Sequence, residues 1–418
     1  MRFAFTEQQL ELRSAVRQVL ERECTPGDLR AIADRRAAAH GSAGHDPDDP
    51  READHTVGRS VERWAVLSEL GAPGLLVAED HGGLGLTDVD LVGVLEEAGW
   101  ASVPEPLAET AGLAAPLLAA AAARATDGAP VQAVADRVLP ALASGDLVAT
   151  VGGVDPTGTL ATETNGAAGL VTTTHPAPAA TGGASAQGTV HTDRVAGAGR
   201  AGLFLLAWDV PGNGWQVHAV ERSAVDVIDT PSIDGTRDLG TVEWTPWPHT
   251  LIASGDQAVV LIDSLADQIA MVYAAQLLGL ADRMITLAAD YAKDRQQFGK
   301  PIGSFQAVKH HLANARVALE FARPATYRAA DSLARRLPDR SEHASMAKAL
   351  ASDAADLAGR VALQVHGAIG YTWESDLQLF MKRAWALSAA GGDAATHRAR
   401  VLAAALARLT SEVKSELR

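Results

Sequence analysis

The chain has 418 residues, more than one hydrophobic core usually supports, so we expect two or three subdomains. Its net charge of −15, with no long basic run, argues against a nucleic-acid binder, and its single cysteine excludes an intrachain disulfide or a CxxC zinc site. Because it lacks the apolar core of a secretion signal and any apolar run of the ~20 residues that cross a bilayer, the sequence predicts a soluble, cytoplasmic protein with no membrane segment.

The N-terminal part is helical in pattern. A helix is predicted over residues 5–35, where Thr6 and Gln9 have the spacing of a capping box. Residues 36–56 are rich in Asp, Pro, Gly and His, which is typical of a loop. Three irregularly spaced histidines of this loop are interpreted as solvated rather than metal-binding: His40, His45 and His55.

A glycine-rich segment, GAPGLLVAEDHGGLGL, interrupts helical patterns that continue to about residue 145. Its HGGLGL end lacks the third glycine of GxGxxG and any βαβ context, so a dinucleotide-binding fold is not predicted there. From about 147 to 250, short β-type runs such as LVATVGG, LFLLAW, WQVHAV and TVEWT alternate with turn residues. They predict a small all-β domain, either a sandwich or a barrel.

Helical patterns return at residue 255 with a long run that contains no proline, so we expect a helix inside a bundle or at a subunit interface. Four further helices are expected, over about 304–336, 340–366, 374–389 and 393–415. We therefore predict a multi-domain α+β fold. Its parts are an N-terminal helical domain over 1–146, a β barrel or sandwich over 147–252, and a C-terminal helical bundle over 253–418.

Four segments resemble the acyl-CoA dehydrogenase family, in family order and over nearly the whole chain: FAFTEQQLELRSAV, ELGAPGLLVAEDHGGLGL, RQQFGKPIGSFQAVKHHLA and QVHGAIGYTWESDLQLFMKRA. Within the family, the chain resembles the divergent members that form α2β2 assemblies in sterol side-chain degradation. The resemblance implies FAD-dependent α,β-dehydrogenation of an acyl-CoA or carrier-bound acyl thioester. It also implies an electron-transfer flavoprotein or similar acceptor, and a homo- or hetero-tetramer in which one subunit holds the flavin ring and its neighbour the ADP half.

The resemblance implies that seven residues of the last two motifs contact FAD: Arg295, Gln297, Phe298, Gln306, Gln364, Gly367 and Ala368. Their chemistry suits that role. Arg295 offers a planar fork of donors for a pyrophosphate, and Phe298 offers a flat apolar face. Gly367 allows close approach of the backbone, whereas Ala368 replaces the family's second glycine.

The base that would remove the α-proton is missing from its usual positions. By the resemblance, Gly391 stands where most members carry a glutamate, and Ile269 where branched-chain enzymes carry it. Gln276 stands at a third position, and an amide cannot accept the proton. Asp393, two residues beyond Gly391, is the nearest carboxylate and our candidate catalytic residue. Alternatively, Asp393 caps the last helix.

The middle domain also departs from the family, because VGGVDPTGTLATETNG does not match the segment with which most members contact the flavin ring. Three hypotheses remain open. The chain is an FAD-dependent acyl-CoA dehydrogenase with an unusual base. It is a non-catalytic partner subunit that supplies the ADP-binding arm to a second dehydrogenase-like chain. Or it is a flavin-free scaffold with the same fold.

Overall fold

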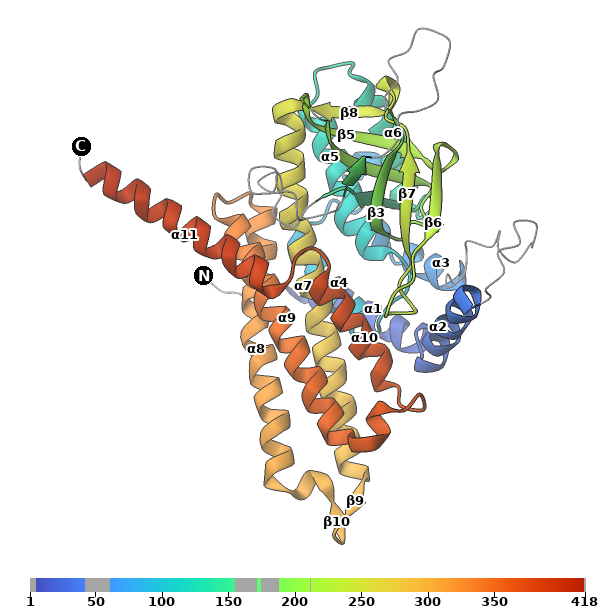
Figure 1. The fold of residues 1–418 in the computed structure, drawn as a ribbon, viewed down its shortest axis with the longest axis vertical. Helices are drawn as coiled ribbons and strands as arrows, with labels where there is room; N and C mark the ends of the chain where they lie inside the picture. The colour runs from blue at the N-terminus through green and yellow to red at the C-terminus, as the bar shows by residue number, and fades with distance from the viewer. Residues whose placement is uncertain (1–4, 42–60, 155–170, 174–187, 211, 417–418) are drawn as a thin grey trace. The chain divides into compact units, whose positions relative to one another are not determined.

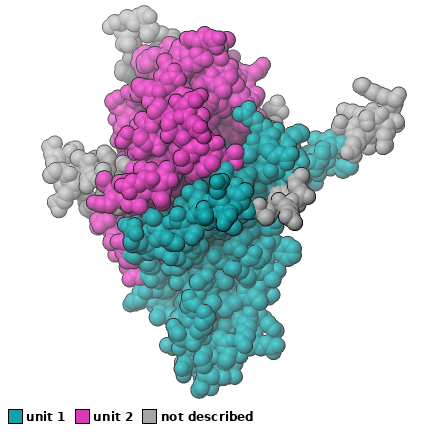
Figure 2. All heavy atoms as spheres, turned by 180° about the vertical axis from the view of Figure 1, so that it is seen from behind, with its two compact units in different colours: residues 1–26, 88–102, 267–418 teal, residues 27–87, 103–266 magenta. Residues whose placement is uncertain are grey.

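The structure, a computed structural model, describes residues 5–41, 61–154, 171–173, 188–210 and 212–416. Backbone contacts divide the chain into two compact units, coloured separately in Figure 2. Unit 1 comprises residues 1–26, 88–102 and 267–418, and unit 2 comprises residues 27–87 and 103–266. Each unit therefore combines segments that are distant in sequence. The three domain boundaries given above stay a prediction.

The predicted helix over residues 5–35 is wrong in one respect, because the structure divides it into α1 (Glu7–Glu23) and α2 (Pro26–Gly41). Proline lacks an N–H and suits the first position of a helix, so the chain starts a new helix at Pro26. The capping box at the start of α1 is present. The Thr6 backbone donates to Gln9 Oε1 at 2.9 Å, and the Gln9 backbone donates to Thr6 Oγ1 at 3.3 Å.

Unit 2 contains two four-stranded sheets (Figure 1). The first has the order β1-β4-β5-β8: Ala149–Gly152, Leu203–Val210, Gly214–Glu221 and Leu251–Ser254, with β1 parallel to β4 and the other pairs antiparallel. The second is antiparallel with the order β2-β3-β7-β6: Val171–Thr173, Val190–Ala196, Leu239–Trp244 and Val225–Asp229. Residues from both sheets, among them Phe204, Trp208 and Trp244, form one buried core. This arrangement confirms the predicted small β domain.

Short helices that precede the β region in sequence complete unit 2. They are α3 (Val61–Glu69), α5 (Ala115–Arg124) and α6 (Pro130–Ala143), with the π-helical segment η3 (Ala108–Ala114) and short 3₁₀ turns η1 (Ala72–Gly74) and η2 (Glu79–His81). Thr110 of η3 donates its hydroxyl to the carbonyl of Ala149 on β1 at 3.0 Å, so a side chain ties this helical segment to the sheet.

Unit 1 is built from long helices, shown in Figure 1. They are α1, α4 (Asp88–Trp100), most of α7 (Gly255–Asp294), α8 (Gln306–Ala334), α9 (Arg340–His366), α10 (Leu377–Ala389) and α11 (Ala394–Glu416). Among the described residues, α7 alone is long and apolar enough to cross a membrane, and 72% of its apolar window is buried. A core helix of a bundle has the same property.

Helices α4 and α7 cross in direct backbone contact. A Cβ placed on Gly279 of α7 would lie 1.9 Å from the carbonyl oxygen of Glu96 and 2.4 Å from the Trp100 nitrogen. A Cβ on Gly99 of α4 would lie 2.1 Å from the carbonyl oxygen of Gln276. Only glycine fits at both positions, so this pair sets how closely the two helices pack.

Buried carboxylates join α1, α4 and α8. Glu96 accepts the Tyr327 hydroxyl at 2.6 Å and lies 3.0 Å from both Arg13 Nη2 and Arg323 Nε. The adjacent Glu97 pairs with Arg13 and Arg17. Such buried charges are stable only when their partners surround them, so this cluster fixes the register of the three helices.

Candidate functional site

The first predicted cofactor motif forms a β-hairpin between α7 and α8. Strands β9 (Gln296–Gln297) and β10 (Lys300–Pro301) pair antiparallel, with Gln297 opposite Lys300. The two turn residues, Phe298 and Gly299, have φ angles of 56° and 75°. Positive φ at both positions is the geometry of a tight hairpin turn, and a bulky residue adopts it only with strain. The hairpin therefore holds the Phe298 ring at its tip despite a backbone cost.

The predicted contact residues of this hairpin face solvent. Arg295, Gln297 and Gln306 are exposed, and Phe298 is 89% exposed. Phe298 packs edge-to-face on Phe305, with 6.0 Å between the ring centroids. The Arg295 carbonyl accepts the Ile302 N–H at 2.8 Å, which fixes the base of the hairpin while leaving its guanidinium at the surface.

The second motif lies at the same end of the helical bundle. Gly367 ends α9 with φ 64° and ψ −140°, and a Cβ there would meet nothing within 4 Å. Gln364 and Ala368 are exposed beside it. His366 donates Nδ1–H to the Ala362 carbonyl at 2.8 Å and stacks on Tyr291 of α7, with centroids 4.5 Å apart. This stack brings the end of α9 next to the end of α7, so the two motifs lie at the same end of the bundle (Figure 1).

The donor set of these two motifs fits a dinucleotide. An exposed guanidinium and three exposed amides can donate to phosphate and ribose oxygens. The ring at the hairpin tip offers an apolar face, and the open backbone at Gly367 leaves room for close approach. These properties are what FAD requires from the chain that holds its ADP half.

The structure brings two of the family's base positions together. A Cβ on Gly391 would lie 2.5 Å from Ile269 Cγ2 and 3.2 Å from Tyr273 Cδ2. The place is thus already filled by apolar and aromatic atoms, and no carboxylate occupies it. The third position, Gln276, lies on α7 where its backbone contacts Gly99 of α4.

Asp393 is placed at the start of α11. Its Oδ1 accepts the Thr396 backbone N–H at 2.8 Å, as an N-cap does. That hydrogen bond lowers the pKa of Asp393 below its ordinary value, because it stabilises the charged form. A carboxylate held in this way is a weaker proton acceptor. Asp393 therefore stays a prediction as the base, and its geometry agrees with the capping alternative.

Behind this turn lies a buried lysine that the sequence did not single out. Lys348 of α9 is fully buried and donates its ammonium to the carbonyls of Gly392 at 2.8 Å and Ser388 at 3.0 Å. His397 donates Nε2–H to the Gly391 carbonyl at 2.8 Å. The backbone of the turn is therefore fixed from its inner side. The sequence signal that could have identified Lys348 is a lysine at an apolar position of an alanine-rich helix.

The burial of two histidines predicts that the folded protein loses stability as the pH falls. Burial lowers the pKa of His397 and of His218, which bonds Thr250 Oγ1 at 2.9 Å, to about 4 each. Since an unfolded histidine titrates near about 6.5, the unfolded chain binds protons more readily below that pH. Stability is therefore complete above pH ~6.5 and falls toward pH ~4, by up to about 3 kcal/mol per histidine.

Urea unfolding at pH 7.5 and pH 4.5 measures this loss, and His397→Gln is expected to reduce it because the variant keeps a donor but does not titrate. Equal pH dependence in wild type and variant would contradict the assignment.

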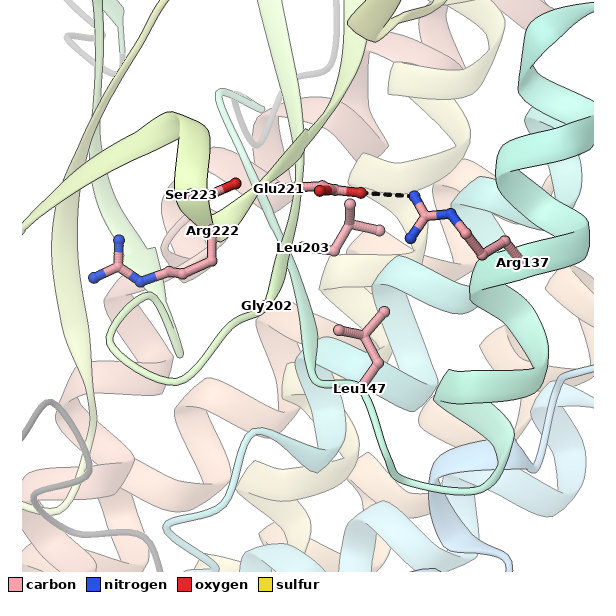
Figure 3. A pocket seen from close by; sticks show the side chains of 7 residues that line it. All are labelled: Arg137, Leu147, Gly202, Leu203, Glu221, Arg222 and Ser223. Carbon is pink, nitrogen blue, oxygen red and sulfur yellow. Dashed lines mark hydrogen bonds and ion pairs between the residues drawn. The ribbon is translucent and has the colours of Figure 1, made fainter.

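Unit 2 has a surface hollow of about 350 Å³ that we do not assign to a ligand (Figure 3). Arg137 points to Glu221 and pairs with it at 2.8 Å, while Arg222 points away and donates to the Val225 carbonyl at 3.2 Å. Both cations are thus already engaged. None of the predicted cofactor residues lines the hollow.

Among the described residues, no group of three or more His, Cys, Asp or Glu side chains is placed to hold a metal. The side chains of His40, His45 and His55 lie outside the described residues, as does most of VGGVDPTGTLATETNG.

Comparisons with known proteins agree with this architecture. The acyl-CoA dehydrogenase N-terminal domain model matches residues 6–146, and the C-terminal domain model matches residues 262–406. The acyl-CoA dehydrogenase IpdE2 of Mycolicibacterium smegmatis is 30% identical over 380 residues, 91% of this chain and 93% of that protein. FadE34 of Mycobacterium tuberculosis is 34% identical over 334 residues, 77% of this chain and 39% of FadE34.

Among solved structures, a chain of the ChsE4-ChsE5 complex from Mycobacterium tuberculosis superposes with a TM-score of 0.73 at 23% identity, covering 96% of this chain and 98% of that one. The two-unit helical and β architecture, with its motifs in family order, is the fold of the acyl-CoA dehydrogenases. The chain belongs to the acyl-CoA dehydrogenase family. The predicted resemblance and the predicted fold class are both confirmed.

Proposed function

We propose that this chain serves the FAD-dependent α,β-dehydrogenation of an acyl-CoA thioester, as a subunit of an oligomeric enzyme. The observation that carries the proposal is the placement of the hairpin and the Gly367 turn at the same end of the bundle, where their exposed donors fit a dinucleotide. Family membership supplies the reaction class. A carrier-bound acyl group would suit the same chemistry.

FAD, when bound, supplies the acceptor for the hydride that leaves the β-carbon. The residues that would hold its ADP half are Arg295, Gln297, Phe298, Gln306, Gln364, Gly367 and Ala368. Their task is to bind and orient, because Arg295 is a fixed fork of donors and the hairpin is stiffened at its base by the Ile302 hydrogen bond. An electron-transfer flavoprotein or a similar protein would then reoxidise the cofactor.

Exposed apolar side chains of unit 1 support an oligomer. Val317 and Phe321 of α8 and three leucines of α11 (Leu402, Leu406 and Leu409) are each more than half exposed. Leu402, Leu406 and Leu409 have the spacing of one helix face, as do Val317 and Phe321, and exposed apolar faces of this kind usually meet another subunit. We infer a homo- or hetero-tetramer from these faces. The cytoplasmic location stays a prediction.

The second candidate is a non-catalytic partner subunit paired with another dehydrogenase-like chain. It is favoured by the apolar filling of the base position, where Ile269 and Tyr273 crowd Gly391. The similarity to a chain of the two-component ChsE4-ChsE5 complex also favours it. In this case Arg295 and its neighbours would bind FAD that lies mainly in the partner.

Purification of the chain alone and together with a neighbouring dehydrogenase-like gene product tests both candidates, with flavin absorbance per chain and native mass as measurements. A yellow homo-oligomer that oxidises acyl-CoA supports the catalytic chain. A colourless chain that becomes yellow only in a hetero-oligomer supports the partner subunit. A colourless chain in both preparations contradicts both and favours the flavin-free scaffold.

A further inference from the structure

The hairpin between α7 and α8 has two faces, and its pairing shows which residues share a face. Gln297 of β9 lies opposite Lys300 of β10. The Ile302 N–H donates to the Arg295 carbonyl at 2.8 Å, so the pairing continues to the base of the hairpin. Side chains alternate between the two faces of a strand, so Arg295 and Gln297 share one face and Gln296 belongs to the other.

Lys300 belongs to the face that carries Arg295 and Gln297. Directly opposite residues of an antiparallel pair point to the same side, with their Cβ atoms about 4.5–5.5 Å apart. A ligand that accepts a hydrogen bond from the Gln297 amide is therefore within reach of the Lys300 side chain. Arg295 and Gln297 are two of the residues predicted to contact FAD, whereas Lys300 is not among those predicted from the motif.

The Lys300 ammonium is held in position but not neutralised. Its Nζ lies 4.4 Å from the centroid of the Phe305 ring, and the side chain is exposed. Over the part of the chain that the structure describes, no carboxylate pairs with this ammonium. Lys293 at the end of α7 differs, because it pairs with Asp290 at 2.8 Å. A cation that rests on an aromatic face keeps its charge and its donors, so Lys300 can bind an anion.

The charge on this face matches a diphosphate. The bridge of a dinucleotide carries two negative charges, one on each phosphate. The planar fork of Arg295 can pair with one phosphate, which leaves the other without a counter-charge. An ammonium is a compact charge with three donors and suits a single phosphate. Arg295 and Lys300 are the two cations of the hairpin, residues 295–301.

We propose that Lys300 is a further FAD-binding residue, which pairs with one phosphate of the diphosphate while Arg295 pairs with the other. Together the two cations select a dinucleotide, because a flavin mononucleotide offers a single phosphate. The Phe305 ring positions Lys300, since it lies beneath the ammonium. This proposal rests on the proposed function and adds one residue to the site that it describes.

The test measures FAD affinity and its dependence on salt. Flavin fluorescence follows the titration of the purified FAD-free assembly with FAD at several salt concentrations. Lys300→Gln is expected to weaken binding by about 10- to 100-fold, because a hydrogen bond from a charged donor to a phosphate is lost. Salt screens charge pairs, so added salt is expected to weaken FAD binding less in this variant than in the wild type. A purely structural role of Lys300 would leave the salt dependence unchanged.

Two variants control this experiment. Lys293→Gln makes the same change in net charge at an exposed lysine that already pairs with Asp290, and is expected to leave FAD affinity and its salt dependence within about 2-fold. Lys300→Arg keeps the positive charge and is expected to bind within about 3-fold of the wild type. Lys300 is exposed, so the circular dichroism spectrum should be the same in all variants.

The outcomes separate this proposal from the proposed function. If Lys300→Gln binds FAD as tightly as the wild type while Arg295→Ala binds it weakly, Lys300 contacts no phosphate and the proposed function stands. Equal losses in Lys300→Gln and Lys293→Gln would also overturn the assignment, because net charge alone would explain them. Absence of FAD binding in every preparation would instead overturn the proposed function.

Discussion

Replacing Arg295 with alanine is expected to weaken FAD binding by about 100-fold and leave the fold unchanged. A guanidinium that makes paired hydrogen bonds to a phosphate contributes about 3 kcal/mol in total, since each bond to a charged group is worth about 1.5–3 kcal/mol. The side chain is exposed and the hairpin is held by backbone bonds, so stability should not change. Flavin fluorescence titration of the FAD-free assembly measures the affinity.

Two variants control this experiment. Lys309→Ala removes another exposed cation one turn into α8 and is expected to leave the affinity within about 3-fold, because surface charges away from the ligand are screened. Arg295→Lys keeps the charge without the planar fork and should fall between wild type and alanine. If Arg295→Ala binds FAD as tightly as wild type, the hairpin is not a cofactor arm.

Gly279→Ala is expected to destabilise unit 1 by about 4 kcal/mol or more. The new methyl would lie 1.9 Å from a backbone oxygen and 2.4 Å from a backbone nitrogen of α4, and neither atom can rotate away. The two helices must then separate and lose packing along their shared length, which places this substitution among the largest single-residue effects. Denaturant unfolding followed by helix circular dichroism measures the loss.

Gly359→Ala is the matched control within the same unit. A Cβ there would meet Met284 Sδ and Met381 Cγ at 3.6 Å, which is ordinary contact, and the residue lies inside α9. Alanine is the better helix former, so the control is expected to be neutral or more stable by about 0.5–1 kcal/mol. If both variants lost the same free energy of unfolding, the close crossing of α4 and α7 would not determine how these helices pack.

Sequence patterns predicted those parts of the fold that local chemistry encodes. The cap at Thr6, the long helix after residue 255 and the alternation of β-type runs all follow from residues near one another in sequence. The break at Pro26 was missed although it is local, because one helix was predicted to continue through the proline. Proline is typical of the first position of a helix, so Pro26 itself could have identified the start of a second helix.

The candidate site was only partly predictable because its geometry is long-range. The seven predicted cofactor residues come from two motifs, but the placement of both motifs at one end of the bundle depends on the stacking of Tyr291 on His366. The packing of Ile269 and Tyr273 against Gly391 likewise joins residues that are distant in sequence.

At the tip of the hairpin, the residue type that best stabilises the turn differs from the one that offers a ring for binding. A two-residue turn with positive φ at both positions is formed most easily by Asn-Gly, and this chain places phenylalanine first. An asparagine at position 298 would relax the turn and remove the ring. A search for more stable variants would therefore tend to select against the ring that the proposed cofactor arm presents, and stability alone is a misleading guide to improvement at this position.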